Sequence, residues 1–156
     1  MERGRHDEAR RLLERFEHAS RADRLFRTTL LPVAARVLVA LGDVGSVQAL
    51  LEGPEPVSTR ERLSTDSAHA VAAEARGDLR AAAERYRVAL APWRRYGMPL
   101  EEGQLLIGLA RCEHGLGRRA EAEVAASAAI EVLTPLGARP LLQEAARLLG
   151  ARTAAT

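Results

Sequence analysis

The chain has 156 residues, of which 47% are hydrophobic and 28% are charged, and its formal net charge is +2. This is the length and composition of one globular or solenoid domain, which buries about two thirds of the unfolded chain's surface. All 23 basic residues are arginine, and they alternate with acidic residues along the chain. This interleaving argues against the one-signed patch that nucleic-acid binding requires.

Cysteine usage and hydropathy define the expected compartment. The single cysteine, Cys112, excludes an intramolecular disulfide and fits a reducing environment. Residues 1–8 contain no apolar signal-peptide core. The longest apolar stretch, residues 30–42, is interrupted by Arg36 and is too short to span a bilayer. We expect a cytoplasmic protein without membrane contact.

The first predicted helix covers residues 5–18. Its apolar residues Ala9, Leu12, Leu13 and Phe16 follow the i, i+3, i+4, i+7 spacing of one helix face. Alanine, leucine, arginine and glutamate dominate the whole chain and favour helix. Since no stretch alternates with period two for long enough to form a strand, the fold class is predicted to be all-α.

A second helix is predicted over residues 22–41 and a short third helix over residues 44–52. Pro32 lies inside the second pattern, so this helix is either kinked there or has its true N-cap at Thr28 or Thr29. Both alternatives follow from proline's missing N–H group.

The strongest loop signal is the segment 53–56, which contains two prolines. Ser58 and Glu61 then have the spacing of a capping box, which predicts the start of a fourth helix that runs to about residue 76. Gly77 is expected to end that helix, and Asp78 to cap the next one.

The C-terminal half predicts helices over residues 79–96, 100–116 and 119–136, and a last helix over 141–149. Pro92 is expected to bend the first of these near its end. The chain therefore predicts about seven to eight helices separated by glycine- and proline-containing turns.

A glycine followed by an alanine-rich amphipathic stretch recurs along the chain. The glycines are Gly4, Gly42, Gly77 and Gly117, separated by 38, 35 and 40 residues. Periods of this size mark arrays in which each helical hairpin buries its apolar face against its neighbours. We predict stacked antiparallel hairpins in a single domain, residues 1–156, with positive φ at Gly77 and Gly117.

The segments that begin at these glycines resemble the second helix of a tetratricopeptide repeat. In residues 77–82 and 117–122 a small residue follows the glycine by five positions, and residues 4–9 give a third copy. The resemblance implies a short right-handed superhelix of helical hairpins. Such arrays bind macromolecules through an extended surface and carry no chemistry of their own.

A narrower resemblance covers residues 86–149. Its segments 93–102, 105–112, 117–122 and 136–142 are similar to the C-terminal helical repeats of large bacterial LuxR-type ATP-binding regulators and of repeat-bearing nucleotide cyclases. The resemblance implies a non-catalytic protein-interaction module of a bacterial signalling or transcriptional regulator. Such a module docks a peptide, a helix or a sister domain, while the output domains lie elsewhere.

In a superhelix of this family the first helix of each hairpin lines the concave groove, which implies where a partner binds. Arg36 and Arg111 are candidates for bidentate contacts to an acidic group, and ordinary exposed arginines are the alternative. The implied partner-binding residues are Arg36, Ser64, Ser67, Val71, Glu74, Gln104, Ile107, Arg111 and His114.

The sequence predicts no catalytic, cofactor or metal site. Without lysine the chain cannot form a phosphate-binding P-loop. Cys112 and His114 lie two residues apart on a predicted helix, point in different directions and cannot share a metal ion, so we interpret Cys112 as a packing residue. Asp66 and His69 are interpreted as a surface pair, because a metal site would need further ligands.

Three functions remain open at this stage. The favoured hypothesis is an interaction module with a protein or peptide partner, which is not an enzyme. The alternatives are an arginine-rich helical protein that binds nucleic acid and a small helical enzyme. A steep salt dependence of DNA affinity would favour the first alternative.

Only three residues precede Gly4, so the chain begins in the middle of a repeat. Either the array is part of a longer one, or the first helix serves as an N-terminal cap. The apolar stripe of that helix then needs a cover. We expect it to pack on the second helix and, in part, on a second copy of the chain, which would give a homodimer.

Overall fold

The computed structural model describes residue 11, residues 24–52 and residues 55–150. In this part of the chain every regular element is an α-helix, which confirms the predicted all-α class. The chain divides into two compact units, residues 1–76 and residues 77–156, and the boundary coincides with the repeat glycine Gly77. The predicted helix 5–18 lies outside the described residues.

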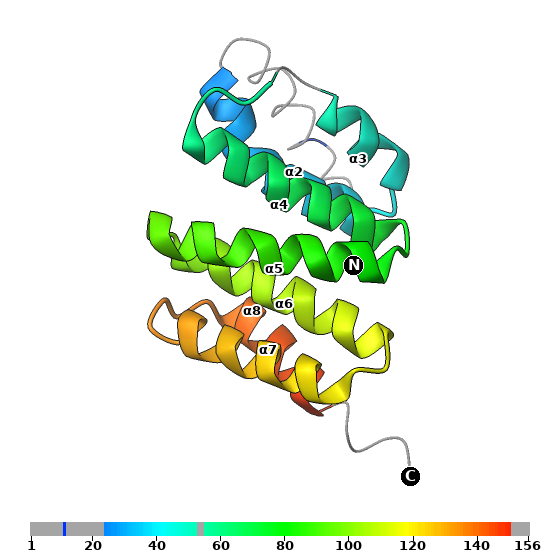
Figure 1. Ribbon diagram of the computed structural model, residues 1–156, viewed down its shortest axis with the longest axis vertical. Coiled ribbons are helices and arrows are strands. Elements are labelled where there is room, and N and C mark those ends of the chain that lie inside the picture. Colours follow the sequence, from blue (N-terminus) through cyan, green and yellow to red (C-terminus); the bar gives the residue numbers. More distant parts are fainter. Residues whose placement is uncertain (1–10, 12–23, 53–54, 151–156) are drawn as a thin grey trace. The chain divides into compact units, whose positions relative to one another are not determined.

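The first unit contains α2 (Arg24–Ala40), α3 (Val44–Leu51) and α4 (Thr59–Ala75). α2 packs against both other helices, and the three are drawn in blue, cyan and green in Figure 1. α2 runs through Pro32, so the alternative that Thr28 or Thr29 caps this helix is wrong. Pro32 itself is fully buried, and burial of Leu31, Ala34 and Ala35 around it offsets the hydrogen bond that the proline removes.

The helix starts of the first unit follow the polar residues in the sequence. Ser58 Oγ accepts from the backbone N–H of Glu61 at 3.1 Å, and Glu61 Oε2 accepts from the N–H of Ser58 at 3.2 Å. This confirms the predicted capping box. Asp43 caps α3 by accepting from the Ser46 N–H at 3.1 Å, after Gly42 has closed the preceding helix with φ +77°.

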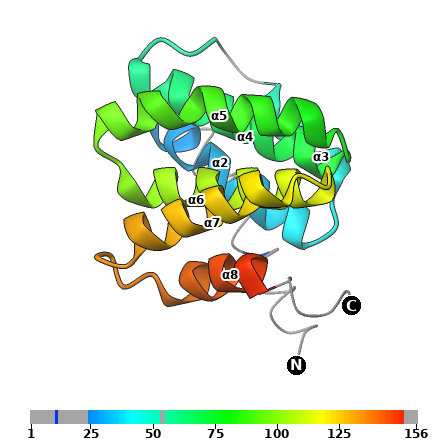
Figure 2. The same cartoon turned by 60° about the horizontal axis from the view of Figure 1, so that its bottom comes forward.

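The second unit contains α5 (Leu79–Tyr96), α6 (Pro99–Gly115), α7 (Arg119–Leu133) and α8 (Arg139–Gly150). Consecutive helices pack against each other, and α8 also contacts α6 (Figures 1 and 2). Asp78 caps α5 as predicted, accepting from the Ala81 N–H at 3.2 Å. The prediction for α7 was three residues too long, because Pro135 has no N–H to continue the helix.

The positive φ predicted for Gly77 and Gly117 is confirmed, with values of +80° and +76°. Equivalent positions in the second unit lie 40 residues apart. Besides Gly77 and Gly117, the glycines Gly97 and Gly137 have positive φ at this spacing. Buried pairs at the same spacing are Ala82 and Ala122, Ala89 and Ala129, Trp93 and Leu133, and Leu105 and Ala145.

Two glycines of α6 make room for large side chains of its neighbours. A Cβ on Gly108 would lie 2.4 Å from Tyr86 Cζ on α5, and a Cβ on Gly103 would lie 2.4 Å from Leu133 Cδ2 on α7. Such separations are shorter than a non-bonded carbon–carbon contact, so any larger residue at either position would require the neighbouring side chain to move. α6 is thus in close contact with both of its neighbours, α5 and α7.

Candidate interaction surface

The second unit carries a groove of about 500 Å³ between α5, α6 and α7. Its floor is formed by Leu106 and Leu109, which are buried, whereas Val124 on its α7 side is 71% exposed. A valine so exposed above an apolar floor offers surface that a partner's apolar side chains would remove from water. The complete lining is Arg87, Leu106, Leu109, Glu113, Ala120, Glu121, Val124, Ala125 and Ala128.

A buried carboxylate closes one end of this groove. The side chain of Glu113 on α6 is 0% exposed and binds two arginines, Arg87 from α5 and Arg118 from the turn before α7. Arg118 Nη1 lies 3.3 Å from Glu113 Oε2, and the Arg118 N–H donates to the Glu113 carbonyl at 2.9 Å. Two cations compensate the desolvation of this charge, so Glu113 joins three elements around the groove end.

A second ion pair joins α5 to the first turn of α6. Arg94 Nε donates to Glu102 Oε1 at 2.8 Å, and the Glu102 side chain is only 8% exposed. Together with the contact between Gly108 and Tyr86, this pair holds α5 on α6 at two points along their length. The groove is therefore formed before any partner arrives, which lowers the entropic cost of binding.

The structure separates the four predicted contact residues of α6. Ile107 is 1% exposed and belongs to the core cluster with Leu106, Ala129, Leu133 and Ala145. Gln104 is half-buried and His114 is exposed. Arg111 is half-buried and pairs with Glu144 of α8 at 2.5 Å. The accessible part of this predicted surface is thus a polar face that spans α6 and α8.

The remaining predicted contact residues lie in the first unit. Ser64, Ser67 and Val71 of α4 are buried, with Ser67 Oγ donating to the Leu63 carbonyl at 2.9 Å. Arg36 of α2 and Glu74 of α4 are half-buried. The side chains that a partner can reach in this set are therefore Arg36 and Glu74, and their contact with a partner stays a prediction.

The sequence did not predict roles for four residues of these surfaces. Three of them, Arg87, Glu113 and Arg118, form the ion pairs at the end of the groove, and the fourth, Glu144, pairs with Arg111. A signal existed for Glu113. It follows Leu106 and Leu109 at helical spacing, so an acid falls on the apolar stripe of α6. A buried acid of this kind requires cationic partners, although the sequence does not say which arginines supply them. Cys112 is buried, as its interpretation as a packing residue requires.

In comparisons with known proteins, no family model, curated protein or solved structure matches this chain. Within residues 24–52 and 55–150, no three His, Cys, Asp or Glu side chains are grouped so as to hold a metal ion. None of the described helices is long and apolar enough to cross a membrane.

Proposed function

We propose that this protein is a non-catalytic protein-interaction module of a bacterial signalling or transcriptional regulator, acting in the cytoplasm. Its groove between α5, α6 and α7 binds an amphipathic helix or peptide of a partner protein. The binding step is docking of apolar side chains into a preformed site, with no covalent chemistry.

One observation carries this proposal: Val124 is 71% exposed beside an apolar floor that rigid helices hold in place. Burial of exposed apolar surface is the dominant favourable term in protein association. The charged residues Arg87 and Glu121 line the same groove and supply polar contacts around that apolar centre, the arrangement typical of interaction sites.

The test is a selection of helical peptides from a displayed library on the immobilised full chain, followed by affinity measurement on two variants. Val124→Glu places a charge in the groove. Val57→Glu is the matched control, because Val57 is also 71% exposed but lies in the first unit.

We expect selected peptides to bind the wild type and Val57→Glu equally, and to lose about tenfold or more in affinity for Val124→Glu. Equal binding to both variants would show that the groove is not the site. Failure to select any binder from the library would also contradict the proposed function.

A further inference from the structure

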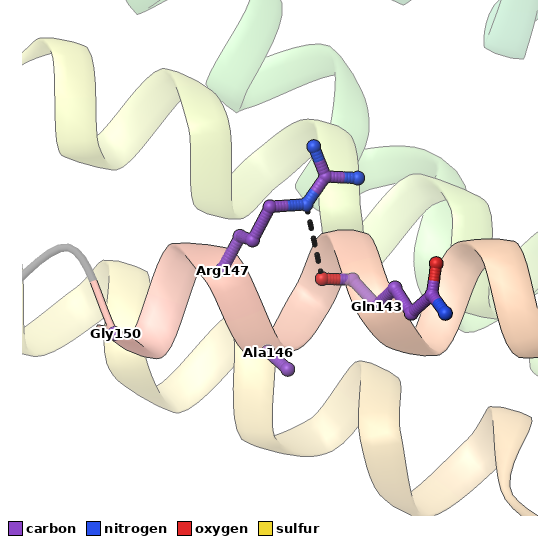
Figure 3. Close-up of a pocket in the computed structure, with 4 residues that line it drawn as sticks. All are labelled: Gln143, Ala146, Arg147 and Gly150. Atoms are coloured by element: carbon purple, nitrogen blue, oxygen red, sulfur yellow. Dashed lines mark hydrogen bonds between the residues drawn. The ribbon is translucent and has the colours of Figure 1, made fainter.

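Two hollows of the second unit differ in what their described walls offer a partner. The hollow beside α8 has a volume of about 680 Å³, and its described lining is Gln143, Ala146, Arg147 and Gly150 (Figure 3). There Arg147 Nε donates to the Gln143 carbonyl at 3.3 Å, and this described lining contains no large apolar side chain. The α5–α6–α7 groove has both an apolar floor and charged walls, so it says more about the chemistry of a partner.

The arginines at the end of the α5–α6–α7 groove are bound to carboxylates of the chain itself. Arg87 Nη1 lies 3.5 Å from Glu84 Oε2, and Arg87 Nη2 pairs with Glu113. Arg118 Nη1 pairs with the same Glu113 at 3.3 Å. An acidic group of a partner would compete with Glu113 for these two arginines. Because Glu113 is 0% exposed, losing them would leave a buried charge without compensation, which is strongly unfavourable.

Glu121 is a groove-lining charge that the described part of the chain leaves unengaged. It is exposed in the first turn of α7, and its carboxylate makes no hydrogen bond or ion pair with the described residues. Glu61 holds the same third position in α4, but its Oε2 accepts from the N–H groups of Val57 and Ser58 at 2.6 and 3.2 Å. Glu121 does not turn back on its helix in this way, so its carboxylate is available to a partner.

The charges of this groove and of their ion-pair partners leave a small negative excess. Among the described residues there are two arginines, Arg87 and Arg118, against three carboxylates, Glu84, Glu113 and Glu121. A positive group of a partner would therefore be attracted to the groove, and an acidic group would be repelled from it. The attraction is strongest beside Glu121, because the other two carboxylates already have arginine partners.

The position of Glu121 on α7 also sets where such a positive group would lie. Glu121 and Val124 are three residues apart and line the same groove, which places them about 4.5 Å apart along the helix axis. A partner helix that runs along α7 and covers Val124 with an apolar side chain would therefore reach Glu121 with a side chain about one turn away. The apolar contact and the charge pair then belong to one face of the partner helix.

We propose that the partner segment is a basic amphipathic helix, whose apolar side chains cover Val124 and whose arginine or lysine pairs with Glu121. The inference rests on the proposed function of the groove and adds the chemical class of its partner. The apolar contact supplies most of the affinity, and the charge pair selects a basic helix over an acidic one.

The test uses helical peptides selected from a displayed library on the immobilised full chain. Their affinities are measured on the wild type, on Glu121→Arg and on Glu123→Arg. Glu123→Arg is the matched control for charge reversal, because Glu123 lies on the same helix, points about 200° away from Glu121 and does not line the groove. Each selected peptide is also made with its basic residue replaced by glutamate.

We expect the selected peptides to carry a basic residue about one turn from an apolar one, and to lose about tenfold in affinity for Glu121→Arg. Glu123→Arg should bind them as the wild type does. The peptide with glutamate should bind Glu121→Arg more tightly than it binds the wild type, because the exchanged charges attract each other again. This recovery also shows that the Glu121→Arg variant is folded.

The failures of the inference and of the proposed function are distinguishable. Peptides that lose affinity for Val124→Glu but bind the wild type and Glu121→Arg equally would overturn the basic partner and leave the groove as the site. The same holds for binders at the groove that are predominantly acidic. A library that yields no binder, or only binders that Val124→Glu leaves unaffected, would overturn the proposed function and this inference with it.

Discussion

The α5–α6 and α7–α8 hairpins share one register but distribute large and small residues in opposite ways. Tyr86 of α5 passes over Gly108 of α6, with no room for a Cβ between them. At the equivalent positions, 40 residues on, α7 has Ala126 and α8 has Leu148. At these equivalent positions the second hairpin has the opposite sizes, so the second unit repeats the spacing of its helices rather than a set of residues.

The same comparison explains why α6 and α8 differ in their surroundings. Both helices turn one buried face toward the preceding helix, where Leu105 and Ala145 are each 0% exposed. On the opposite face α6 has side chains that suit burial under α7, whereas α8 has polar or very small ones. The difference lies in the residues themselves, since Gln143 and Arg147 stand where α6 has Gly103 and Ile107.

The largest effect is expected from substitutions that disrupt the packing of Tyr86 on Gly108. Tyr86→Ala should lower the free energy of unfolding by about 3–5 kcal/mol, because the buried ring leaves a cavity over Gly108. Gly108→Leu alone should destabilise through overpacking. The double variant copies the pair Ala126 and Leu148, and urea unfolding should show it to be more stable than the sum of the single effects. Additive effects would mean that the residues at positions 86 and 108 do not compensate for each other's size.

A smaller effect is expected at Glu113, the fully buried carboxylate of the α5–α6 hairpin; among the described residues the α7–α8 hairpin has no buried carboxylate. Glu113→Gln should cost about 1.5–3 kcal/mol, because the charge-assisted bonds to Arg87 and Arg118 weaken inside a buried site. Thermal and urea unfolding measure this cost. Glu84→Gln is the control, since Glu84 meets the same Arg87 with its side chain 69% exposed. Equal effects of the two substitutions would refute a special role of Glu113.

The turn glycines test whether the register is the same in both hairpins. Gly77→Ala and Gly117→Ala should each cost about 1–2 kcal/mol, because their φ values of +80° and +76° strain any residue with a Cβ. The two costs should agree closely, since the positions are equivalent and a Cβ at either one would meet no neighbouring atom within 4 Å. Unchanged unfolding free energy for either variant would contradict the hairpin boundaries.

The smallest effect is expected at the pair that joins α6 to α8. Glu144→Gln should change the unfolding free energy by less than about 1 kcal/mol, since both Arg111 and Glu144 are more than one third exposed and water screens their attraction. The change should shrink further in high salt. A cost as large as that of Glu113→Gln would show that this pair is structurally as important as the buried one.

Local signals in the sequence predicted much of the fold. Ser58 and Glu61 cap α4 because their side chains reach backbone groups within one turn, and Gly77 ends a helix through its own φ. Such interactions involve neighbours in the chain and can be read from spacing. Pro32 shows the limit of that reading: tertiary burial of Leu31 and Ala35 continues a helix that local preference would have started later.

The candidate surfaces were less predictable because they depend on which helix faces which. Ile107 follows the spacing of an exposed groove residue but packs in the core with Leu133. Val124 has the spacing of an ordinary amphipathic helix, and only the position of Leu106 and Leu109 beside it makes a groove.

The most direct test of the proposed groove is amide hydrogen exchange of the wild-type chain with and without a helical peptide selected on it, read out by mass spectrometry. We predict that the peptide slows exchange in residues 120–128, whose side chains line the α7 side of the groove, while residues 59–75 of α4 stay unchanged. Exchange that the peptide leaves unchanged in residues 120–128, or that it slows only in residues 59–75, would contradict the assignment of the partner site to this groove.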